Sequence, residues 1–287
     1  MTGMTDTLVT FPSGSLTERA TVRSVDVDDR WRRVLTDRTP FHPVDHGWPD
    51  QGPDRGTLDR GGRSAAVVDC VVGATDGTDL FVGADVPVRR GEPGWSFVVV
   101  HTLDVGVLDL AAGDEVTLTV DAEHRAELSA GHTGCHLAAL ALNAALAGRW
   151  RKNPRTDSLG RPDFDGAAIV SSRIEPFGSV DVYRLGRSLR KSGFDPAGLA
   201  DDLPGLSDAV DATLAGWVAA GSAVRVETAG PALTDLREWV CVLPDGTARI
   251  PCGGTHVSSL SRLGALRVSL TLAEDGQRLI MHTAVGR

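Results

Sequence analysis

Short segments rich in valine, leucine and threonine, separated by glycine, proline and aspartate, dominate the first 121 residues. Apolar and polar residues alternate strictly over residues 115–120, which indicates a strand with one buried face and one solvated face. The same composition predicts strands over residues 20–28, 64–72, 80–82, 96–103 and 114–121. Closely spaced short strands with polar turns are typical of a small barrel or sandwich.

The pattern changes near residue 121, where we expect a domain boundary. The alanine- and leucine-rich run from His136 to Leu146 predicts a helix within residues 123–150, because no helix breaker follows before Gly148. A second helix is expected over residues 206–220, and strands over residues 168–174, 179–185, 223–228, 238–243, 265–272 and 278–284. This order predicts an α+β fold in which helices pack on a mostly antiparallel sheet. We therefore expect a flexible N-terminus over residues 1–15 and two domains over residues 16–121 and 122–287.

Composition narrows the class of protein. No apolar run approaches the roughly 20 residues of a membrane-spanning helix, and residues 1–15 lack the basic and apolar regions of a secretory signal. We therefore expect a cytoplasmic protein without a membrane partner; the sequence indicates no protein partner. Four scattered cysteines do not form a disulfide framework, so they are expected to be core residues or metal ligands. The net charge of −9 is not typical of a general nucleic-acid binder.

Two pairs of potential metal ligands repeat one spacing. His132 and His136 lie four residues apart in the predicted helix, which puts both imidazoles on one face, one turn apart. Cys252 and His256 have the same spacing, and the glycines at 253 and 254 permit a tight backbone path between them. A single pair is more often an ordinary surface or core feature, but two pairs favour a tetrahedral Zn²⁺ site with three histidines and one cysteine.

These motifs resemble the two signatures of the alanyl-tRNA synthetase editing domain and of free-standing editing proteins known as AlaX. The first is Gly-His-Thr-Gly-Cys-His-Leu at residues 131–137, and the second is Cys-Gly-Gly-Thr-His-Val at residues 252–257. Upstream, residues 37–43 are similar to the segment that leads into the family's glycine-rich loop, and Gln51, Asp54 and Gly56 match the Gln-x-x-Asp-x-Gly that ends it. Residues 112–125 resemble the entry into the catalytic domain. The similarity covers most of residues 36–286 and includes no aminoacylation domain, so synthetase activity is not implied.

The resemblance implies an N-terminal β-barrel followed by a two-layer α/β editing domain that holds zinc. It implies hydrolysis, in trans, of the ester of tRNA(Ala) mischarged with serine or glycine, and therefore contact with the tRNA acceptor end. Thr39 and Gln51 are the candidate polar contacts to the acyl group. Bound Zn²⁺ lowers the pKa of a coordinated water to about 7, polarises the ester carbonyl or anchors the substrate. Because four protein ligands fill a tetrahedral zinc, we expect one of them, Cys252 above all, to be displaced, or a water to join as fifth ligand.

The glycine-rich loop is where the sequence departs from the family. Residues 44–50 are Val-Asp-His-Gly-Trp-Pro-Asp, so His46 and Trp48 either reshape the substrate cavity or lie in an ordinary surface hairpin. Two alternatives therefore stay open. One is a metal-dependent hydrolase of another small ester or amide on the same scaffold, and the other is a non-catalytic binding module that retains zinc for structure.

Basic residues gather in two runs that follow the predicted ligand helix. The first run contributes the candidate tRNA contacts Arg149, Arg151, Lys152 and Arg155. The second run contains Arg184, Arg187, Arg190 and Lys191. Either run is suited to RNA phosphates, and Trp150 to stacking on a base, although basic runs are more often only solvated surface.

Overall fold

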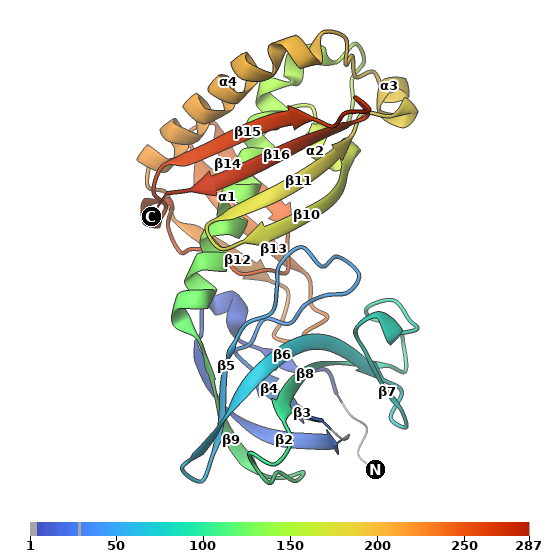
Figure 1. Cartoon of the computed structure of the whole chain (residues 1–287), viewed down its shortest axis with the longest axis vertical. Coiled ribbons are helices and arrows are strands. Elements are labelled where there is room, and N and C mark those ends of the chain that lie inside the picture. The colour runs from blue at the N-terminus through green and yellow to red at the C-terminus, as the bar shows by residue number, and fades with distance from the viewer. Residues whose placement is uncertain (1–4, 28–29, 287) are drawn as a thin grey trace. The chain divides into compact units, whose positions relative to one another are not determined.

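The computed structural model describes residues 5–27 and 30–286 (Figure 1). It divides into two compact units. The first comprises Met1–Arg125, Glu227–Arg237 and Gly253–Thr255, and the second comprises Ala126–Val226, Glu238–Cys252 and His256–Arg287. Both units are discontinuous in sequence. The division into residues 1–15, 16–121 and 122–287 stays a prediction. Residues 1–4 of the expected flexible N-terminus, and Asp28 at the end of the first expected strand, lie outside the described residues.

Antiparallel strands form most of the first unit. Its strands are β1 (Leu8–Val9), β2 (Thr17–Val27), β3 (Trp31–Thr36), β4 (Arg38–Thr39), β5 (Gly56–Arg60), β6 (Arg63–Thr75), β7 (Leu80–Val82), β8 (Ser96–Asp104) and β9 (Glu115–Val120). Seven of them form one sheet in the order β5-β9-β2-β3-β8-β6-β7, and β5 also pairs with β6. This additional pairing is compatible with the expected barrel, but a closed barrel stays a prediction. β1 and β4 form a separate parallel pair.

The alternating strands bury most of their apolar side chains in one core. Leu58 and Leu118, directly paired between β5 and β9, are fully buried, and so is Val34 of β3. The N-terminal segment joins this core, since Val9 and Phe11 are buried and the Val9 amide donates to the Pro231 carbonyl at 2.8 Å. Part of the segment that we expected to be flexible therefore packs against a chain segment more than 200 residues away.

The second unit combines two antiparallel sheets with helices. One sheet has the order β10-β11-β16-β15 and the other β12-β13-β14. The strands are β10 (Ile169–Glu175), β11 (Gly178–Arg184), β12 (Val224–Thr228), β13 (Arg237–Leu243), β14 (Gly246–Pro251), β15 (Leu266–Leu272) and β16 (Arg278–Val285). Six of the seven agree within one or two residues with the expected strands. The expected α+β fold with mostly antiparallel strands is confirmed.

Two long helices contribute to the core of this unit. The helices are α1 (Ala122–Ala145), α2 (Phe164–Ala168), α3 (Arg187–Ser192) and α4 (Leu199–Ala219). Figure 1 shows α1 running behind the four-stranded sheet and α4 lying along it near β15. Buried side chains of α1, α4 and both sheets form one cluster that includes Leu137, Leu214, Trp239 and Met281. Within the described residues, no helix is both long enough and apolar enough to span a bilayer.

Candidate metal centre

The four predicted ligands come together within the second unit. His132 and His136 project from adjacent turns of α1, while Cys252 and His256 follow the end of β14. One ligand atom from each side chain lies within 4.8 Å of the others. Cys252 and His132 are 120 positions apart in the sequence, so the fold rather than local spacing creates this cluster.

The distances within the cluster suit a tetrahedral ion. Cys252 Sγ lies 3.5 Å from His132 Nε2 and 3.3 Å from His256 Nε2. Zn–S and Zn–N bonds of ordinary length place such ligand atoms roughly 3.5 Å apart across a tetrahedron. The His132 ring centroid is 4.7 Å from that of His136 and 4.5 Å from that of His256. The donor set and its spacing therefore fit a zinc ion.

Burial keeps His136 neutral without closing the site completely. Loss of hydration lowers the pKa of His136 to about 4, so its imidazole is uncharged at neutral pH. His136 Nε2 is itself buried and has no hydrogen-bond partner within the described residues. His132 is buried, whereas His136, Cys252 and His256 are half-buried. Three of the four ligand residues thus retain some exposure, as a site that admits a reactant requires.

Thr133, inside the first motif, fixes the orientation of a ligand from the second. Its hydroxyl lies 3.3 Å from His256 Nδ1 and donates its single hydrogen to the Ser129 carbonyl at 2.8 Å. The hydroxyl therefore accepts from His256 Nδ1–H, which leaves Nε2 with a lone pair for a metal. It also accepts from the Val257 amide at 3.2 Å. Sequence reasoning missed this role, although the position of Thr133 between the two histidines was a signal.

Trp239 of β13 forms an apolar wall beside the ligands. Its side chain is fully buried, and its ring centroid lies 5.3 Å from that of His136 and 6.1 Å from that of His256. A large buried ring at this position limits the water that reaches the two imidazoles and restricts their rotation. Nothing in the spacing of the motifs indicated this residue, because β13 precedes Cys252 by a whole hairpin.

Gly131 sets the depth at which α1 packs. A Cβ at this position would meet the Glu175 carbonyl oxygen at 2.3 Å and the Gly178 carbonyl oxygen at 2.6 Å, both at the β10–β11 turn. The turn is held to the helix by a hydrogen bond from the Phe177 amide to the Glu127 carbonyl at 3.1 Å. Only glycine permits this close approach immediately before His132, so the motif's first residue positions its first ligand.

Comparison with curated proteins gives relatives over most of the chain. An alanine–tRNA ligase of Myxococcus xanthus is 25% identical over 257 residues, which cover 88% of this chain and 24% of the ligase. The ligase of Kocuria rhizophila is 27% identical over 236 residues. The alanyl-tRNA editing protein AlaX-M of Pyrococcus horikoshii is 25% identical over 236 residues, 82% of this chain and 78% of AlaX-M. The chain is similar to AlaX-M over most of its length. It spans about a quarter of the length of the ligases that it matches, and no family model matches it.

Two residues of the AlaX-like Gln-x-x-Asp-x-Gly segment are buried anchors in the first unit. The side-chain nitrogen of Gln51, Nε2, donates to Thr255 Oγ1 at 2.9 Å. Its side-chain oxygen, Oε1, accepts from the Thr255 backbone amide at 3.0 Å. Asp54 forms a buried ion pair with Arg125, whose Nε lies 2.7 Å from Asp54 Oδ1. Because Thr255 directly precedes His256 in the sequence, Gln51 restrains the backbone of the second AlaX-like signature. Direct contact of Gln51 with an acyl group stays a prediction.

Thr39, the other candidate acyl contact, lies in the core of the first unit. It is fully buried, and its hydroxyl lies 2.8 Å from His101 Nε2 and accepts from the Phe41 amide at 3.1 Å. His101 Nδ1 lies 3.1 Å from the Val34 carbonyl, so the imidazole donates there and accepts from Thr39. Burial lowers the pKa of His101 to about 4, which is consistent with this neutral form. A contact between Thr39 and substrate also stays a prediction.

The first basic run is largely engaged within the second unit. Arg149 forms an ion pair with Asp202, and Arg151 forms one with Asp195. Arg149 also donates to two backbone carbonyls, at 2.9 and 3.2 Å, and only 15% of its side chain is exposed. Arg155 is exposed. RNA binding by Arg149, Arg151, Lys152 and Arg155 stays a prediction.

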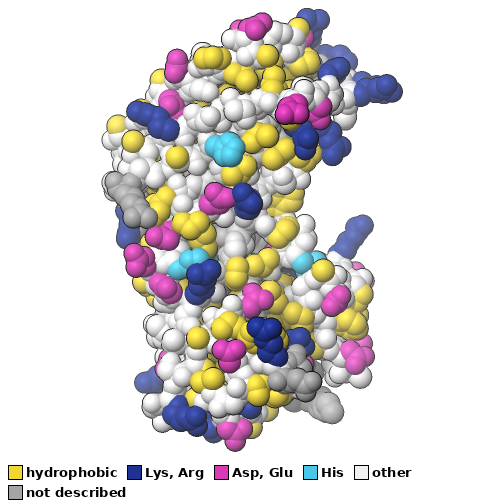
Figure 2. All heavy atoms as spheres, in the orientation of Figure 1, with side chains coloured by type: hydrophobic (Ala, Val, Ile, Leu, Met, Phe, Trp, Pro, Cys, Tyr) yellow, Lys and Arg dark blue, Asp and Glu magenta, His cyan; other side chains and the backbone are white. Residues whose placement is uncertain are grey.

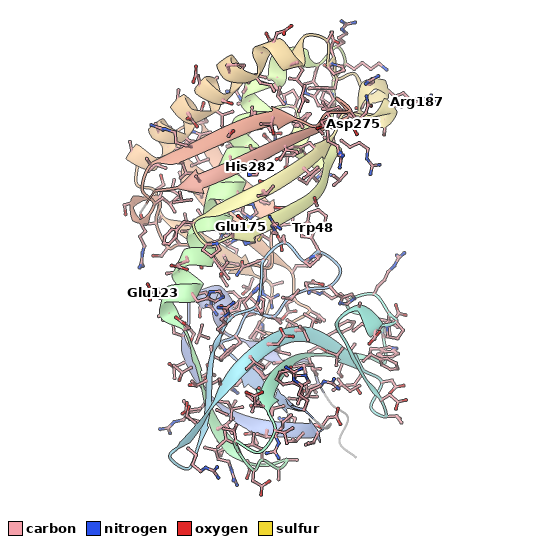
Figure 3. All side chains as sticks on the ribbon, viewed as in Figure 1. Trp48, Glu123, Glu175, Arg187, Asp275 and His282 are labelled. Carbon is pink, nitrogen blue, oxygen red and sulfur yellow. The ribbon has the colours of Figure 1, made fainter. Side chains whose placement is uncertain are left out.

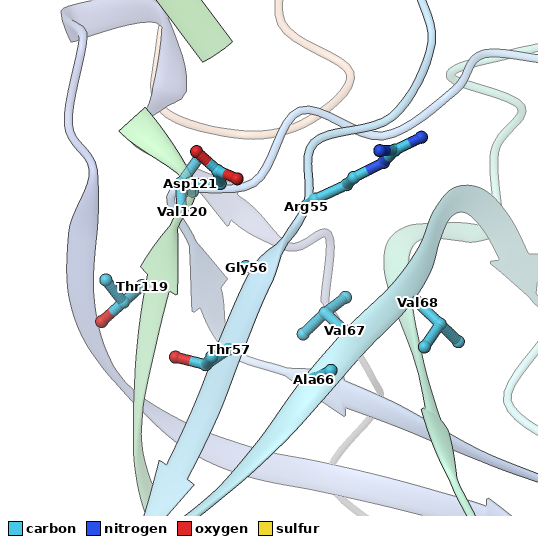
Figure 4. A pocket seen from close by; sticks show the side chains of 9 residues that line it. All are labelled: Arg55, Gly56, Thr57, Ala66, Val67, Val68, Thr119, Val120 and Asp121. Carbon is cyan, nitrogen blue, oxygen red and sulfur yellow. The ribbon is translucent and has the colours of Figure 1, made fainter. Parts of the chain in front are cut away.

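The first unit also carries a groove of about 620 Å³, drawn in Figure 4. It is lined by Arg55, Gly56, Thr57, Ala66, Val67, Val68, Thr119, Val120 and Asp121. None of the four metal-ligand candidates lines it, and its only charged residues are one arginine and one aspartate. Its chemistry does not match that of the metal centre, so we assign it no role in a reaction.

Proposed function

We propose that this AlaX-like chain hydrolyses, in trans, the ester of tRNA(Ala) mischarged with serine or glycine. The convergence of His132, His136, Cys252 and His256 in one cluster carries the proposal. It is supported by AlaX-M, an alanyl-tRNA editing protein, of which the similarity covers 78%. The proposed substrate implies a cytoplasmic location and contact with the acceptor end of the tRNA.

The same four residues are proposed to hold Zn²⁺. Three imidazole nitrogens and one thiolate are ligands that zinc prefers. The distances from Cys252 Sγ to Nε2 of His132 and of His256, 3.5 and 3.3 Å, support a tetrahedral arrangement. When bound, zinc supplies Lewis acidity, either to lower the pKa of a water or to polarise the ester carbonyl. The exposure of three ligand residues supports a site that a reactant can reach over a closed structural site.

The chain's own residues have distinct tasks in this proposal. Thr133 holds the His256 tautomer, because its hydroxyl accepts from Nδ1–H. Trp239 covers His136 and His256 and limits access of bulk water. Gln51 restrains the backbone of Thr255, and hence the path between Cys252 and His256. An aminoacyl ester is activated already, so positioning of this kind supplies much of the catalysis that it needs.

The test is deacylation of Ser-tRNA(Ala) by the purified protein, with and without chelator. We expect release of serine that chelator abolishes and added zinc restores, while Ala-tRNA(Ala) remains intact. His136→Ala is expected to lose zinc and activity together. His282→Ala removes an exposed histidine of the same unit outside the cluster and serves as the matched control. Chelator-insensitive release, or no release by fully zinc-loaded protein, would contradict the proposal.

A second candidate is hydrolysis of another small ester or amide on the same scaffold. The observation in its favour is the loop over residues 44–50, where Trp48 is 46% exposed and Asp45 forms an ion pair with Arg90. Hydrolysis of small aminoacyl esters without hydrolysis of charged tRNA would select this candidate. Stoichiometric zinc with no hydrolysis of either substrate would select the third reading, a non-catalytic zinc module.

A further inference from the structure

The second basic run lies on one exposed surface of the second unit. Arg184 ends β11, and α3 carries Arg187, Arg190 and Lys191; all four side chains are exposed. Arg278 begins β16 and pairs in register with Arg184. We call these five residues the α3 patch. Figure 2 shows Lys and Arg side chains gathered in this region, and Figure 3 labels Arg187 there.

The α3 patch leaves its positive charge largely uncompensated. Directly opposed residues of antiparallel strands lie on the same face, so Arg184 and Arg278 repel one another. Arg278 has a partly exposed aspartate, Asp275, at 3.6 Å. In the described part of the chain, no carboxylate forms an ion pair with Arg184, Arg187, Arg190 or Lys191. Such an arrangement costs stability in the isolated protein and becomes favourable when an anion binds.

The first basic run supports this surface instead of extending it. The Arg151 amide donates to the Gly193 carbonyl at 2.9 Å, and Lys152 Nζ donates to the Lys191 carbonyl at 2.8 Å. The Trp150 and Phe194 rings pack edge to face at 5.4 Å. These contacts tie the chain after α1 to the C-terminal end of α3. The short helix is therefore a fixed platform, and its cations are presented in a defined arrangement.

The composition of the surface selects the kind of anion. A protein partner or a membrane requires exposed apolar side chains at the centre of the contact. The large exposed hydrophobic residues of the second unit are Val170 and Val242, and neither belongs to the α3 patch. Four of the five patch residues are arginines, which bind phosphate oxygens in a bidentate manner. Because the chain has a net charge of −9, a polyphosphate can be held only by a local patch of this kind.

We propose that the α3 patch binds the phosphate backbone of RNA. The proposal rests on the proposed function, since tRNA is the substrate there. The patch lies beyond the C-terminal end of α1, and the nine residue steps from His136 to Ala145 alone span about 14 Å at 1.5 Å per step. The backbone that it contacts is therefore several nucleotides away from the ester, and the contact adds affinity without taking part in the reaction.

The experiment measures binding of uncharged, fluorescently labelled tRNA(Ala) to the zinc-loaded full chain over a range of salt concentrations. We expect Arg187→Ala/Arg190→Ala to weaken binding at least tenfold at low salt. The slope of log K against log salt should fall by roughly 1.4–1.8, from two lost phosphate contacts. Alanine preserves helix propensity in α3. The matched control is Arg19→Ala/Arg23→Ala, which removes two exposed charges from β2 of the first unit. It should leave the slope unchanged.

Each outcome decides the proposal. An unchanged slope in the α3 variant overturns it, and so does an equal change in the control, which would indicate a general charge effect. Binding to polyglutamate and to phosphatidylserine vesicles is measured in parallel. If the α3 variant loses binding to either of these but keeps its binding to tRNA, the proposal is also overturned. Because uncharged tRNA carries no ester, a failure of the proposed hydrolysis leaves this measurement intact. If hydrolysis is observed, a raised KM with an unchanged kcat supports the α3 patch, and an unchanged KM contradicts it.

Discussion

Replacing Thr133 with valine isolates the contact that orients His256. Valine keeps the shape of the side chain at a fully buried position but removes the hydroxyl that lies 3.3 Å from His256 Nδ1. Without this acceptor, the imidazole is no longer held in the tautomer that leaves Nε2 available. Loss of such an outer contact typically weakens metal binding by about 10- to 100-fold, which corresponds to about 1.4–2.7 kcal/mol.

The same substitution affects stability by a separate route. The Val257 amide, which donates to Thr133 Oγ1 at 3.2 Å, loses this acceptor. A fully buried donor without an acceptor costs about 1–3 kcal/mol, and the half-buried Val257 amide is expected to cost less than this. The Ser129 carbonyl loses a donor as well but lies within α1, where the helix ladder supplies another. Metal affinity and stability must therefore be measured independently.

Zinc affinity is measured by competition with a chromophoric chelator, and the stability of the zinc-free protein by denaturant unfolding. Thr133→Ser keeps the hydroxyl and is expected to retain wild-type zinc affinity. Thr133→Val should lose 10- to 100-fold in affinity, even under conditions where the protein is fully folded. Wild-type affinity in the valine variant, or an equal loss in the serine variant, would refute the assigned role.

Three further predictions concern packing, pH and a buried ion pair. Gly131→Ala places a methyl group against two backbone carbonyls, so unfolding should show a loss of about 1–3 kcal/mol; Gly216→Ala, with open space, should not destabilise α4. The pKa of His101 falls from 6.5 to about 4 on folding, so its stabilising contribution is complete above pH 6.5 and disappears as pH falls toward 4. Between pH 6.5 and pH 4 the wild-type protein should therefore lose about 3 kcal/mol of unfolding free energy at most. Urea titrations at the two pH values should show a smaller loss for His101→Gln. Arg125→Met leaves the Asp54 carboxylate buried without its partner, so thermal unfolding should show a cost of about 3–5 kcal/mol; an unchanged Tm would contradict this.

Much of the candidate site was predictable from local spacing. His132 and His136 lie one turn apart because α1 has 3.6 residues per turn, and that periodicity is visible in the chain. The strands of the second unit were likewise visible as short runs of alternating or β-branched residues. β3 and α3 were not expected, because arginines interrupt the hydrophobic pattern of β3 and α3 consists mainly of polar residues. Local patterns identify elements whose apolar residues recur regularly and miss those in which charged or polar residues break the repeat.

What the sequence by itself determined is therefore which residues are candidate ligands, their pairwise spacing and the AlaX-like resemblance. Tertiary structure decided that Cys252 lies beside His132 and that Thr133 orients His256. It also decided that Trp239 covers the imidazoles of His136 and His256. It also decided that Arg149 and Arg151 are neutralised by Asp202 and Asp195. The physical reason is that spacing along one element is set by its own backbone geometry. Contacts between residues more than a hundred positions apart depend on how whole elements pack, and no local pattern encodes that packing.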